Sequence, residues 1–262
     1  MELNAREVTI RHALTRSAVY SLLVKSFKYP TELVFDFIRS TGFDETLREL
    51  AGLNSDDRLH QQVDSFATVH SRLATTNGRG ALETEYNRLF AHLGSAKCPP
   101  YETEFGYENV FQKTQAMADI AGFYNAYALE PASTDTERVD FISTELEFMS
   151  YLALHEAYAR EHGEDEHLDV CIDTQRKFLL DHLGRWVSVF ANILSNASSN
   201  PFYTWLGRFT ECFIDSEAHH LEVALEKVTG PVKIESAVPE PFGCDECVAH
   251  QAMNDERAQQ EG

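Results

Sequence analysis

The chain has 262 residues, of which 43% are hydrophobic and 11% aromatic, so it is long enough to bury a core and too apolar to be disordered throughout. Its 42 acidic and 22 basic residues give a formal net charge of −20. That charge disfavours nucleic-acid phosphates and anionic lipid as partners and favours basic ones, although solubility alone also explains it.

The ends of the chain and its cysteines suggest a compartment. The first twenty residues lack the apolar run of a secretory signal, and no apolar run approaches the ~20 residues of a membrane span. We therefore expect a cytoplasmic protein without stable membrane insertion. Five cysteines, an odd number without a secretory signal, fit reduced thiols: Cys98, Cys171, Cys212, Cys244 and Cys247.

Apolar residues recur at helical spacing through the first half of the chain. A stripe over residues 19–27 stops before Pro30, which suits the first turn of a following helix. A more polar helix is expected over 56–74, and the glycine-containing stretch 77–80 should break it. Helical periodicity then resumes over 83–93.

The middle of the chain alternates a loop, a helix and a linker. The loop over 94–106 contains Pro99 and Pro100, which exclude helix there. A helix with its apolar stripe starting at Val110 should end near residue 131. A polar linker over 132–136 follows it.

The second half shows three clear helical stripes, over 142–153, 179–193 and 202–213. Strand-like alternation is confined to 232–238. The sequence therefore predicts an all-α protein, a single helical-bundle domain in two parts. We expect an N-terminal part (1–131), a linker or hinge (132–141), a C-terminal part (142–230) and an irregular tail (231–262).

Two patterns could bind metal. Cys244 and Cys247 form a C-x-x-C pair near His250, but no second ligand pair is nearby, and a passive tail is the simpler interpretation. Two E-x-x-H motifs also occur, Glu164 with His167 and Glu217 with His220. Pairs of such motifs build di-metal sites in helical bundles, so a helical metal-binding enzyme is the alternative hypothesis.

Motifs typical of nucleotide binding or nucleophilic catalysis are missing: the sequence has neither a G-x-x-x-x-G-K-[ST] loop nor a G-x-S-x-G elbow. The segments 85–90 and 98–106 instead alternate aromatic residues with carboxylates beside the Pro99-Pro100 turn. They fit either a well-packed loop or a groove with an apolar floor and an acidic rim, suited to an apolar peptide flanked by basic residues.

At these residues the sequence resembles the TorD/DmsD/NarJ family of redox-enzyme maturation chaperones. The likeness is greatest to the branch serving type II DMSO-reductase-family enzymes, such as dimethyl sulfide and ethylbenzene dehydrogenases and selenate and chlorate reductases. The matching stretches are 85–90, 98–106, 113–124, 137–152, 178–190 and 202–213.

The resemblance implies an all-helical chaperone, not an enzyme, without a cofactor of its own. Its partners would be the apo catalytic subunit of a molybdenum-cofactor oxidoreductase and that subunit's twin-arginine signal peptide, and it would assist cofactor insertion and delay export. The family's hinge signature Glu-x-Pro-Asp-His corresponds here to Glu137, Arg138, Val139, Asp140 and Phe141, so Pro and His are replaced.

Combining the resemblance with the charge pattern gives a candidate client-binding set. The aromatic residues would take the apolar part of the peptide, and Asp140 would anchor a client arginine. The set is Tyr86, Leu89, Phe90, Pro99, Pro100, Tyr101, Glu102, Glu104, Phe105, Glu137, Asp140 and Phe141.

Overall fold

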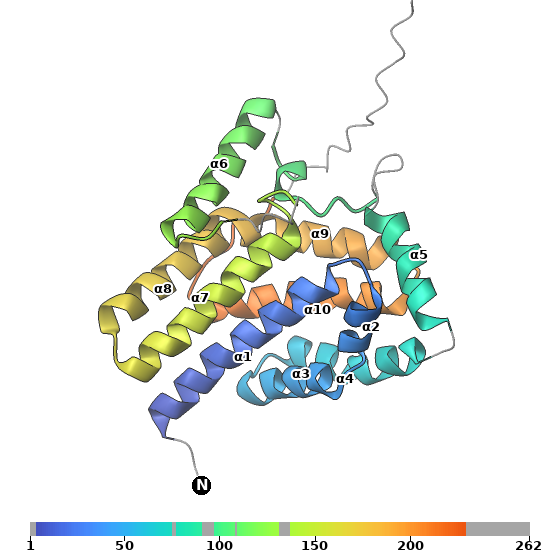
Figure 1. Ribbon diagram of the computed structural model, residues 1–262, viewed down its shortest axis with the longest axis horizontal. Helices are drawn as coiled ribbons and strands as arrows, with labels where there is room; N and C mark the ends of the chain where they lie inside the picture. The colour runs from blue at the N-terminus through green and yellow to red at the C-terminus, as the bar shows by residue number, and fades with distance from the viewer. Residues whose placement is uncertain (1–3, 75–76, 91–96, 108, 131–136, 229–262) are drawn as a thin grey trace, which may run out of the picture.

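The computed structural model describes residues 4–74, 77–90, 97–107, 109–130 and 137–228 (Figure 1). In these residues the regular structure is helical, apart from an isolated bridge between Tyr101 and Phe141, which confirms the predicted all-α class. The helices are α1 (Ala5–Ser26), α2 (Glu32–Ile38), α3 (Thr41–Leu53), α4 (Asp57–Leu73), α5 (Gly78–Phe90), the 3₁₀ turn η1 (Glu102–Glu104), α6 (Val110–Ala126), α7 (Ile142–His162), α8 (Asp165–Phe178), the π turn η2 (Leu179–Leu183), α9 (Gly184–Ala197) and α10 (Pro201–His220).

Most helix starts have a local cause in the sequence. Asn4 and Glu7 form a capping box at α1, and Asp56 accepts a hydrogen bond from the Arg58 N–H at the start of α4. Asn200 caps α10, with Pro201 in its first turn. These side chains satisfy amide groups that have no partner within the helix.

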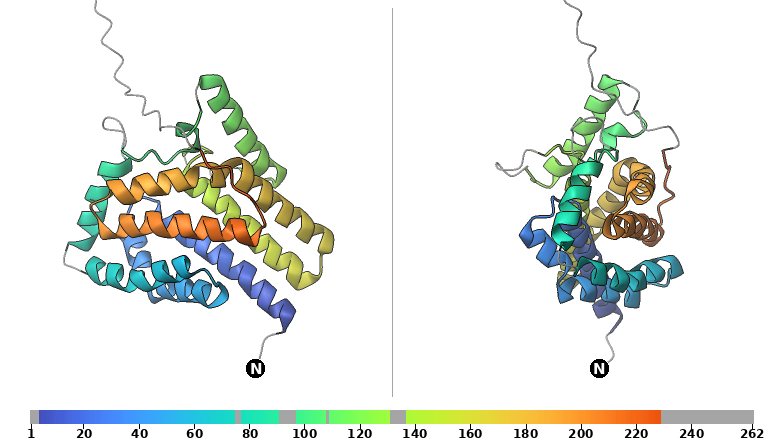
Figure 2. Two further views of the ribbon diagram at one scale, coloured as in Figure 1. Left: turned by 180° about the vertical axis from the view of Figure 1, so that it is seen from behind. Right: turned by 90° about the vertical axis from the view of Figure 1, so that its right-hand side faces the viewer.

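The helices form two packed layers. α1 lies along α7, which also contacts α8, while α10 packs against α9 and α4 (Figures 1 and 2). α3 closes the lower end of the molecule against α1 and α4. α6 projects from the opposite end, and the η1 turn lies beside it (Figure 1).

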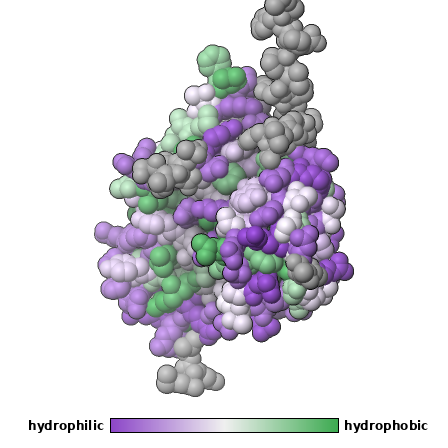
Figure 3. Space-filling view, turned by 45° about the vertical axis from the view of Figure 1, so that its right-hand side comes forward, coloured by the Kyte–Doolittle hydropathy of each residue, from purple (hydrophilic) through white to green (hydrophobic). Residues whose placement is uncertain are grey.

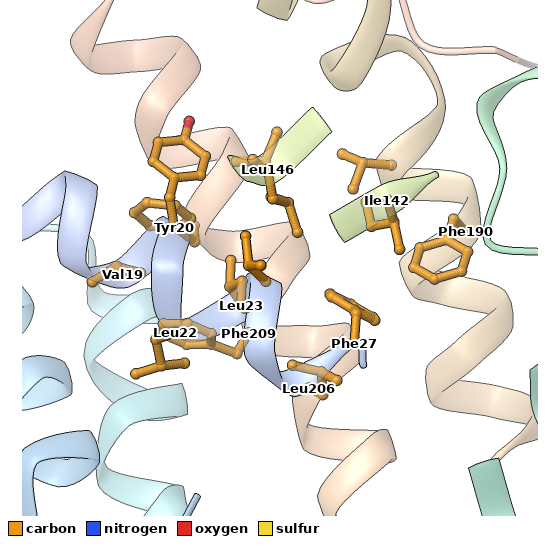
Figure 4. Packing of buried hydrophobic residues seen from close by; sticks show 14 of the residues in the cluster. Val19, Tyr20, Leu22, Leu23, Phe27, Ile142, Leu146, Phe190, Leu206 and Phe209 are labelled. Carbon is orange, nitrogen blue, oxygen red and sulfur yellow. The ribbon is translucent and has the colours of Figure 1, made fainter. Parts of the chain in front are cut away.

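One hydrophobic core runs through both halves of the chain (Figure 4). Leu23 of α1 packs between Leu146 of α7 and Phe209 of α10, and all three side chains are fully buried. Burying one such side chain contributes about 1.5–3 kcal/mol. The described residues before the hinge and those after it therefore stabilise each other through a shared core.

A buried cluster of charged groups ties four helices together. Arg16 of α1 donates to both carboxylate oxygens of Glu217 on α10 at 2.9 Å and to Glu156 on α7 at 2.8 Å. It also donates to the side-chain oxygen of Gln175 on α8 at 2.6 Å. Although burial alone lowers the pKa of Arg16, the Glu217 carboxylate raises it above its ordinary value, so the guanidinium stays charged.

The structure corrects several predicted elements. Pro30 lies before α2, whose N-cap is Thr31, and is not in the helix's first turn. Gly78 and Gly80 belong to the first turn of α5. The helix α3 was not predicted from the sequence, and residues 179–183 of the helix expected over 179–193 form a π turn. The linker residues 132–136, the strand-like 232–238 and the tail 231–262 lie outside the described residues.

The face shown in Figure 3 is mainly hydrophilic, in keeping with the acidic composition. Its apolar patches include the free end of α6, where Phe111 is 87% exposed. None of the helices among the described residues has the length and hydrophobicity of a membrane span.

The buried Glu85 of α5 predicts loss of stability in acid. Burial alone would raise its pKa, but hydrogen bonds from Arg88, Ser199 and Ser198 outweigh that effect and lower it from 4.5 to about 2. The stability that this carboxylate contributes is fully present above pH 4.5 and is lost as the pH falls towards 2.

Glu85→Gln should therefore lower the urea midpoint of unfolding at pH 7. Near pH 2, the urea midpoints of Glu85→Gln and the wild type should become equal. The matched control is Glu83→Gln on the same helix, whose partner Arg79 is 3.7 Å away and partly exposed, and it should change little at either pH. A pH-independent difference between Glu85→Gln and the wild type would contradict this assignment.

Candidate functional site

The two segments singled out in the sequence, 98–106 and 137–141, lie against each other. The Ile142 N–H donates to the Pro100 carbonyl oxygen, and the Glu102 N–H donates to the Asp140 carbonyl oxygen, each at 2.9 Å. These bonds flank the bridge between Tyr101 and Phe141, whose rings are 5.5 Å apart. The loop and the hinge therefore form one unit at the start of α7.

Asp140 holds this unit together from inside. Its side chain is fully buried, and Oδ2 accepts hydrogen bonds from the Thr103 N–H and hydroxyl at 3.1 and 2.8 Å. Arg138 donates to both carboxylate oxygens, at 2.9 and 2.7 Å. The Arg138 guanidinium also lies 4.4 Å from the centre of the Tyr101 ring. Asp140 thus already has an intramolecular arginine.

A groove opens beside the hinge, between the end of α1, α5, the end of α6 and the start of α7. It consists of two adjoining hollows of about 450 and 260 Å³ that share Lys28, Glu137, Thr144 and Glu147. We call it the hinge groove. Its other lining residues are Tyr29, Tyr86, Tyr124, Leu129, Glu130, Val139, Phe141, Ser143, Phe148 and Tyr151.

The floor of the hinge groove is aromatic at both ends. Tyr86 packs edge-on against Tyr29 and Phe90, with ring centres 5.3 and 4.9 Å apart. In the larger hollow, Tyr124 packs on Phe148 at 5.0 Å. Rings held this way offer apolar area that loses little side-chain entropy when a ligand covers it.

The rim of the hinge groove is acidic. Glu130, Glu137 and Glu147 are exposed at its edge, against a single lysine, Lys28. The Glu137 charge also acts on the aromatic floor. Burial is the larger cause and the Glu137 charge the next, and together they raise the pKa of Tyr86 to about 12. Such a groove favours a ligand with an apolar stretch next to positive charge.

Only part of the predicted set lines this groove. Tyr86, Glu137 and Phe141 do, and Tyr101 lies beside it, in contact with Phe141 and Arg138. Pro100 and Phe90 do not line the groove but contact its surroundings. The Pro100 carbonyl oxygen accepts a hydrogen bond from the Ile142 N–H, and the Phe90 ring packs edge-on against Tyr86.

The remaining predicted residues lie elsewhere. Leu89 and Phe105 are core residues, and the Phe105 ring packs on Trp186 at 5.2 Å. Glu102 is buried beside His182, and Glu104 pairs with Lys113 at 3.4 Å. The placement of Asp140 revises the expected arginine contact: the carboxylates that a ligand can reach are those of Glu130, Glu137 and Glu147.

Sequence reasoning missed the part of the groove contributed by other helices. Lys28, Tyr124 and Tyr151 come from elements that are far apart in the chain, and none lies in a recognisable motif. Tyr124, Glu147 and Tyr151 do fall inside stretches that carried the family resemblance, 113–124 and 137–152. That was the one available signal.

The candidate metal ligands are used differently. Glu217 accepts a hydrogen bond from Arg16, and the His220 ring packs at a tilt against His12, with 4.5 Å between ring centres. Glu164 and His167 pair with each other on the surface at 3.1 Å. In the part of the chain that the structure describes, no group of three or more His, Cys, Asp or Glu side chains is placed to hold a metal ion. Cys244, Cys247 and His250 lie outside it.

Comparison with known proteins adds an independent line of evidence. A family model described as the nitrate reductase delta subunit matches residues 41–192. The chaperone protein TorD of Photobacterium profundum is 24% identical over 162 residues, 62% of this chain and 74% of that protein. TorD of Shewanella pealeana is 21% identical over 217 residues, 80% of this chain and 91% of that protein. The chlorate reductase assembly chaperone protein of Ideonella dechloratans is 30% identical over 118 residues, 43% and 57% of the two chains.

Proposed function

The chain belongs to the nitrate reductase delta subunit family and is a maturation chaperone of the TorD type, and from this premise we propose what it binds and where. Its client is the catalytic subunit of a molybdenum-cofactor oxidoreductase before the cofactor is inserted. The hinge groove receives the client's twin-arginine signal peptide. Occupying that peptide delays export until the cofactor is in place.

The observation that carries this proposal is the hinge groove itself. It combines an aromatic floor with three exposed carboxylates and one lysine. A twin-arginine signal peptide has the complementary order, a basic start followed by an apolar stretch. The apolar stretch would cover Tyr86 and Tyr124, and the arginines would meet Glu137 and Glu147 at the rim.

The hydrogen bonds among Asp140, Arg138 and Thr103 support this assignment because they give the groove a fixed wall. Asp140, Arg138 and Thr103 are bonded to one another, so the loop and the hinge keep their positions without a ligand. A preorganised site spends less of its binding energy on ordering the protein. The branch serving chlorate reductase and its relatives fits best as the source of the client, since the Ideonella relative is named for chlorate reductase assembly.

Peptide titration tests the proposal. We expect a synthetic twin-arginine signal peptide to bind the purified chain, and calorimetry should show weaker binding when both arginines are lysine and still weaker binding when the apolar centre carries an aspartate. Lysine keeps the charge but loses the two-pronged hydrogen bonding of the guanidinium. Equal affinity for all three peptides would show that the groove recognises neither the arginines nor the apolar centre of the signal peptide.

A further inference from the structure

Two carboxyl groups are buried where the 98–106 loop meets α7. Glu102 belongs to the η1 turn of that loop, and Glu145 lies in the first turn of α7. Glu102 is 1% exposed and Glu145 is 0% exposed. Glutamate side chains are almost never buried to this extent unless other groups pair with them, so the partners of each carboxyl group decide its state.

Glu102 has the polar partners that a buried carboxylate needs. Its Oε1 accepts a hydrogen bond from the Tyr107 hydroxyl at 2.5 Å, and its Oε2 lies 3.2 Å from His182 Nδ1. The other ring nitrogen of His182 lies 3.3 Å from Asp119 on α6. The Glu102 N–H donates to the Asp140 carbonyl oxygen at 2.9 Å, which holds this residue to the hinge as well.

Glu145 has much less support. Its Oε2 accepts a hydrogen bond from the Trp186 indole N–H at 3.1 Å, and its Oε1 is buried without a hydrogen-bond partner. The indole is a neutral donor. An ionised carboxylate in this position would be strongly unfavourable, because a buried charge needs a counter-charge and further hydrogen bonds. The geometry therefore favours the neutral carboxylic acid.

The charges around Glu145 act in the same direction. Burial is the largest cause that raises its pKa well above the ordinary 4.5, and the negative charge of Glu102 is the next. Asp140 raises it further, while the hydrogen bond from Trp186 opposes these effects. Burial and the neighbouring acids thus both disfavour ionisation of Glu145.

The other titratable groups near this pair leave the α7 carboxyl group without a cation of its own. Burial raises the pKa of Tyr124 on α6 and that of Tyr107, so both phenols stay neutral. Arg138 donates to the Asp140 carboxylate at 2.7 Å, and Arg185 Nη1 lies 3.5 Å from the Tyr107 hydroxyl. Both guanidinium groups therefore have other partners.

A proton on Glu145 Oε1 accounts for these observations together. The Glu102 carboxylate is within hydrogen-bonding reach of Glu145. A neutral Glu145 can donate from Oε1 to Glu102 while its Oε2 keeps the hydrogen bond from the indole. The oxygen that otherwise has no partner then becomes a donor, and two negative charges no longer meet in the core.

We propose that Glu145 carries a proton at neutral pH and donates it in a hydrogen bond to Glu102, so that the two carboxyl groups form a proton-dependent latch between the 98–106 loop and α7. Loss of the proton sets two buried negative charges against each other and releases the loop. Because Glu102 is bonded to the hinge, release also loosens the wall that Phe141 gives to the hinge groove. The latch does not depend on which ligand that groove binds.

Infrared spectroscopy of the full chain tests the protonation directly. A protonated carboxyl group has a C=O stretching band that is separate from the bands of carboxylates and amides. We expect the wild type to show such a band at pH 7 and Glu145→Gln to lose it. The control is Glu161→Gln, an exposed glutamate of the same helix, which should keep the band. A wild type without the band at pH 7, or a band unchanged in Glu145→Gln, would overturn the proposal.

The latch also has its own pH dependence. A carboxyl group whose pKa is raised by folding contributes fully to stability below its ordinary pKa of 4.5, and this contribution is lost as the pH rises. Glutamine keeps the donor and the acceptor of the neutral acid but does not ionise. Above pH 4.5, the folded-to-unfolded ratio of the wild type should therefore fall relative to that of Glu145→Gln by up to about tenfold per pH unit. Equal pH dependence of the two proteins from about pH 5 to about pH 9 would contradict the latch.

Hydrogen exchange measures the release of the loop. The Glu102 N–H is bonded to the Asp140 carbonyl oxygen, and the Phe105 N–H to the Glu102 carbonyl oxygen. As the pH rises, protection of these two amides should fall in the wild type more than in Glu145→Gln, once the intrinsic pH dependence of exchange is subtracted. The amides of α3, at the other end of the molecule, are the internal reference. Equal loop protection in both proteins at every pH would remove the latch.

Discussion

Replacing Arg16 with methionine is expected to lower the free energy of unfolding by about 3–5 kcal/mol, the usual effect of removing one partner from a buried ion pair. The guanidinium contacts Glu156 and Glu217, which are both buried. Without it, Glu217 has lost its neutralising partner, and Glu156 keeps Arg160 at 2.9 Å as its cation, together with a hydrogen bond from Gln175 at 3.0 Å. The lost contacts join α1 to α7, α8 and α10, so the damage spreads through the whole bundle.

Thermal and urea unfolding measure this effect, which should lower the melting temperature on the order of 10 °C. The matched control is Arg11→Met on the same helix. Arg11 pairs with Glu49 at 2.7 Å, but its side chain is 53% exposed, so we expect less than about 1 kcal/mol. Equal stability of Arg16→Met and Arg11→Met would mean that the buried cluster does not hold the helices together.

Glu156 adds a pH signature to the same cluster. Burial alone would raise its pKa, but Arg16, Gln175 and Arg160 outweigh that effect and lower it to about 2. The stability that Glu156 contributes is therefore present at neutral pH and lost as the pH falls from its usual 4.5 towards 2. Arg16→Met should therefore lower the free energy of unfolding at neutral pH and also reduce its dependence on pH between 4.5 and 2.

Tyr86→Ala is expected to weaken binding of the twin-arginine signal peptide by about tenfold, since it removes the aromatic floor at one end of the hinge groove. Glu137→Gln with Glu147→Gln should weaken binding by a similar factor at low salt, because the rim then no longer attracts the arginines. Raising the salt concentration should erase the effect of the charge variant and leave that of Tyr86→Ala, since salt screens the exposed charges and not the apolar contact.

Each variant has a control on the surface. Tyr158 of α7 is about half exposed and stacks on His162, outside the groove lining, so Tyr158→Ala should leave peptide affinity unchanged. Glu45→Gln with Glu166→Gln removes two exposed charges from elsewhere on the chain. If these control variants lower the affinity for the peptide as much as the groove variants do, the groove is not the binding site.

The helical class followed from the sequence because apolar residues at three- and four-residue steps mark a buried helix face directly. The family resemblance placed the 98–106 loop and the hinge in one candidate set, but their contact was not predicted, since no periodicity links segments so far apart. The π turn escaped prediction because residues 179–193 keep a continuous apolar stripe through it. α3 escaped although it buries Phe43, Leu47 and Leu50 at helical spacing.

The candidate site was harder to predict because burial decides which residues a ligand can reach. Asp140 and Phe105 have the residue types expected of a binding site, yet Arg138 takes up the first and Trp186 covers the second. Conversely, Lys28, just after α1, and Tyr151 of α7 line the hinge groove because α1 and α7 pack side by side. The sequence pattern identifies the segments that contribute to the candidate site, but tertiary packing determines which of their side chains a ligand can reach.

The most direct test of the central claim compares two forms of one client. The catalytic subunit of a molybdenum-cofactor oxidoreductase, carrying its signal peptide, is prepared with and without the cofactor, and its affinity for this chain is measured by surface plasmon resonance. A maturation chaperone must release the finished enzyme, so we predict clearly tighter binding to the cofactor-free form. Equal affinity for the two forms, or binding to neither, would contradict the proposed function.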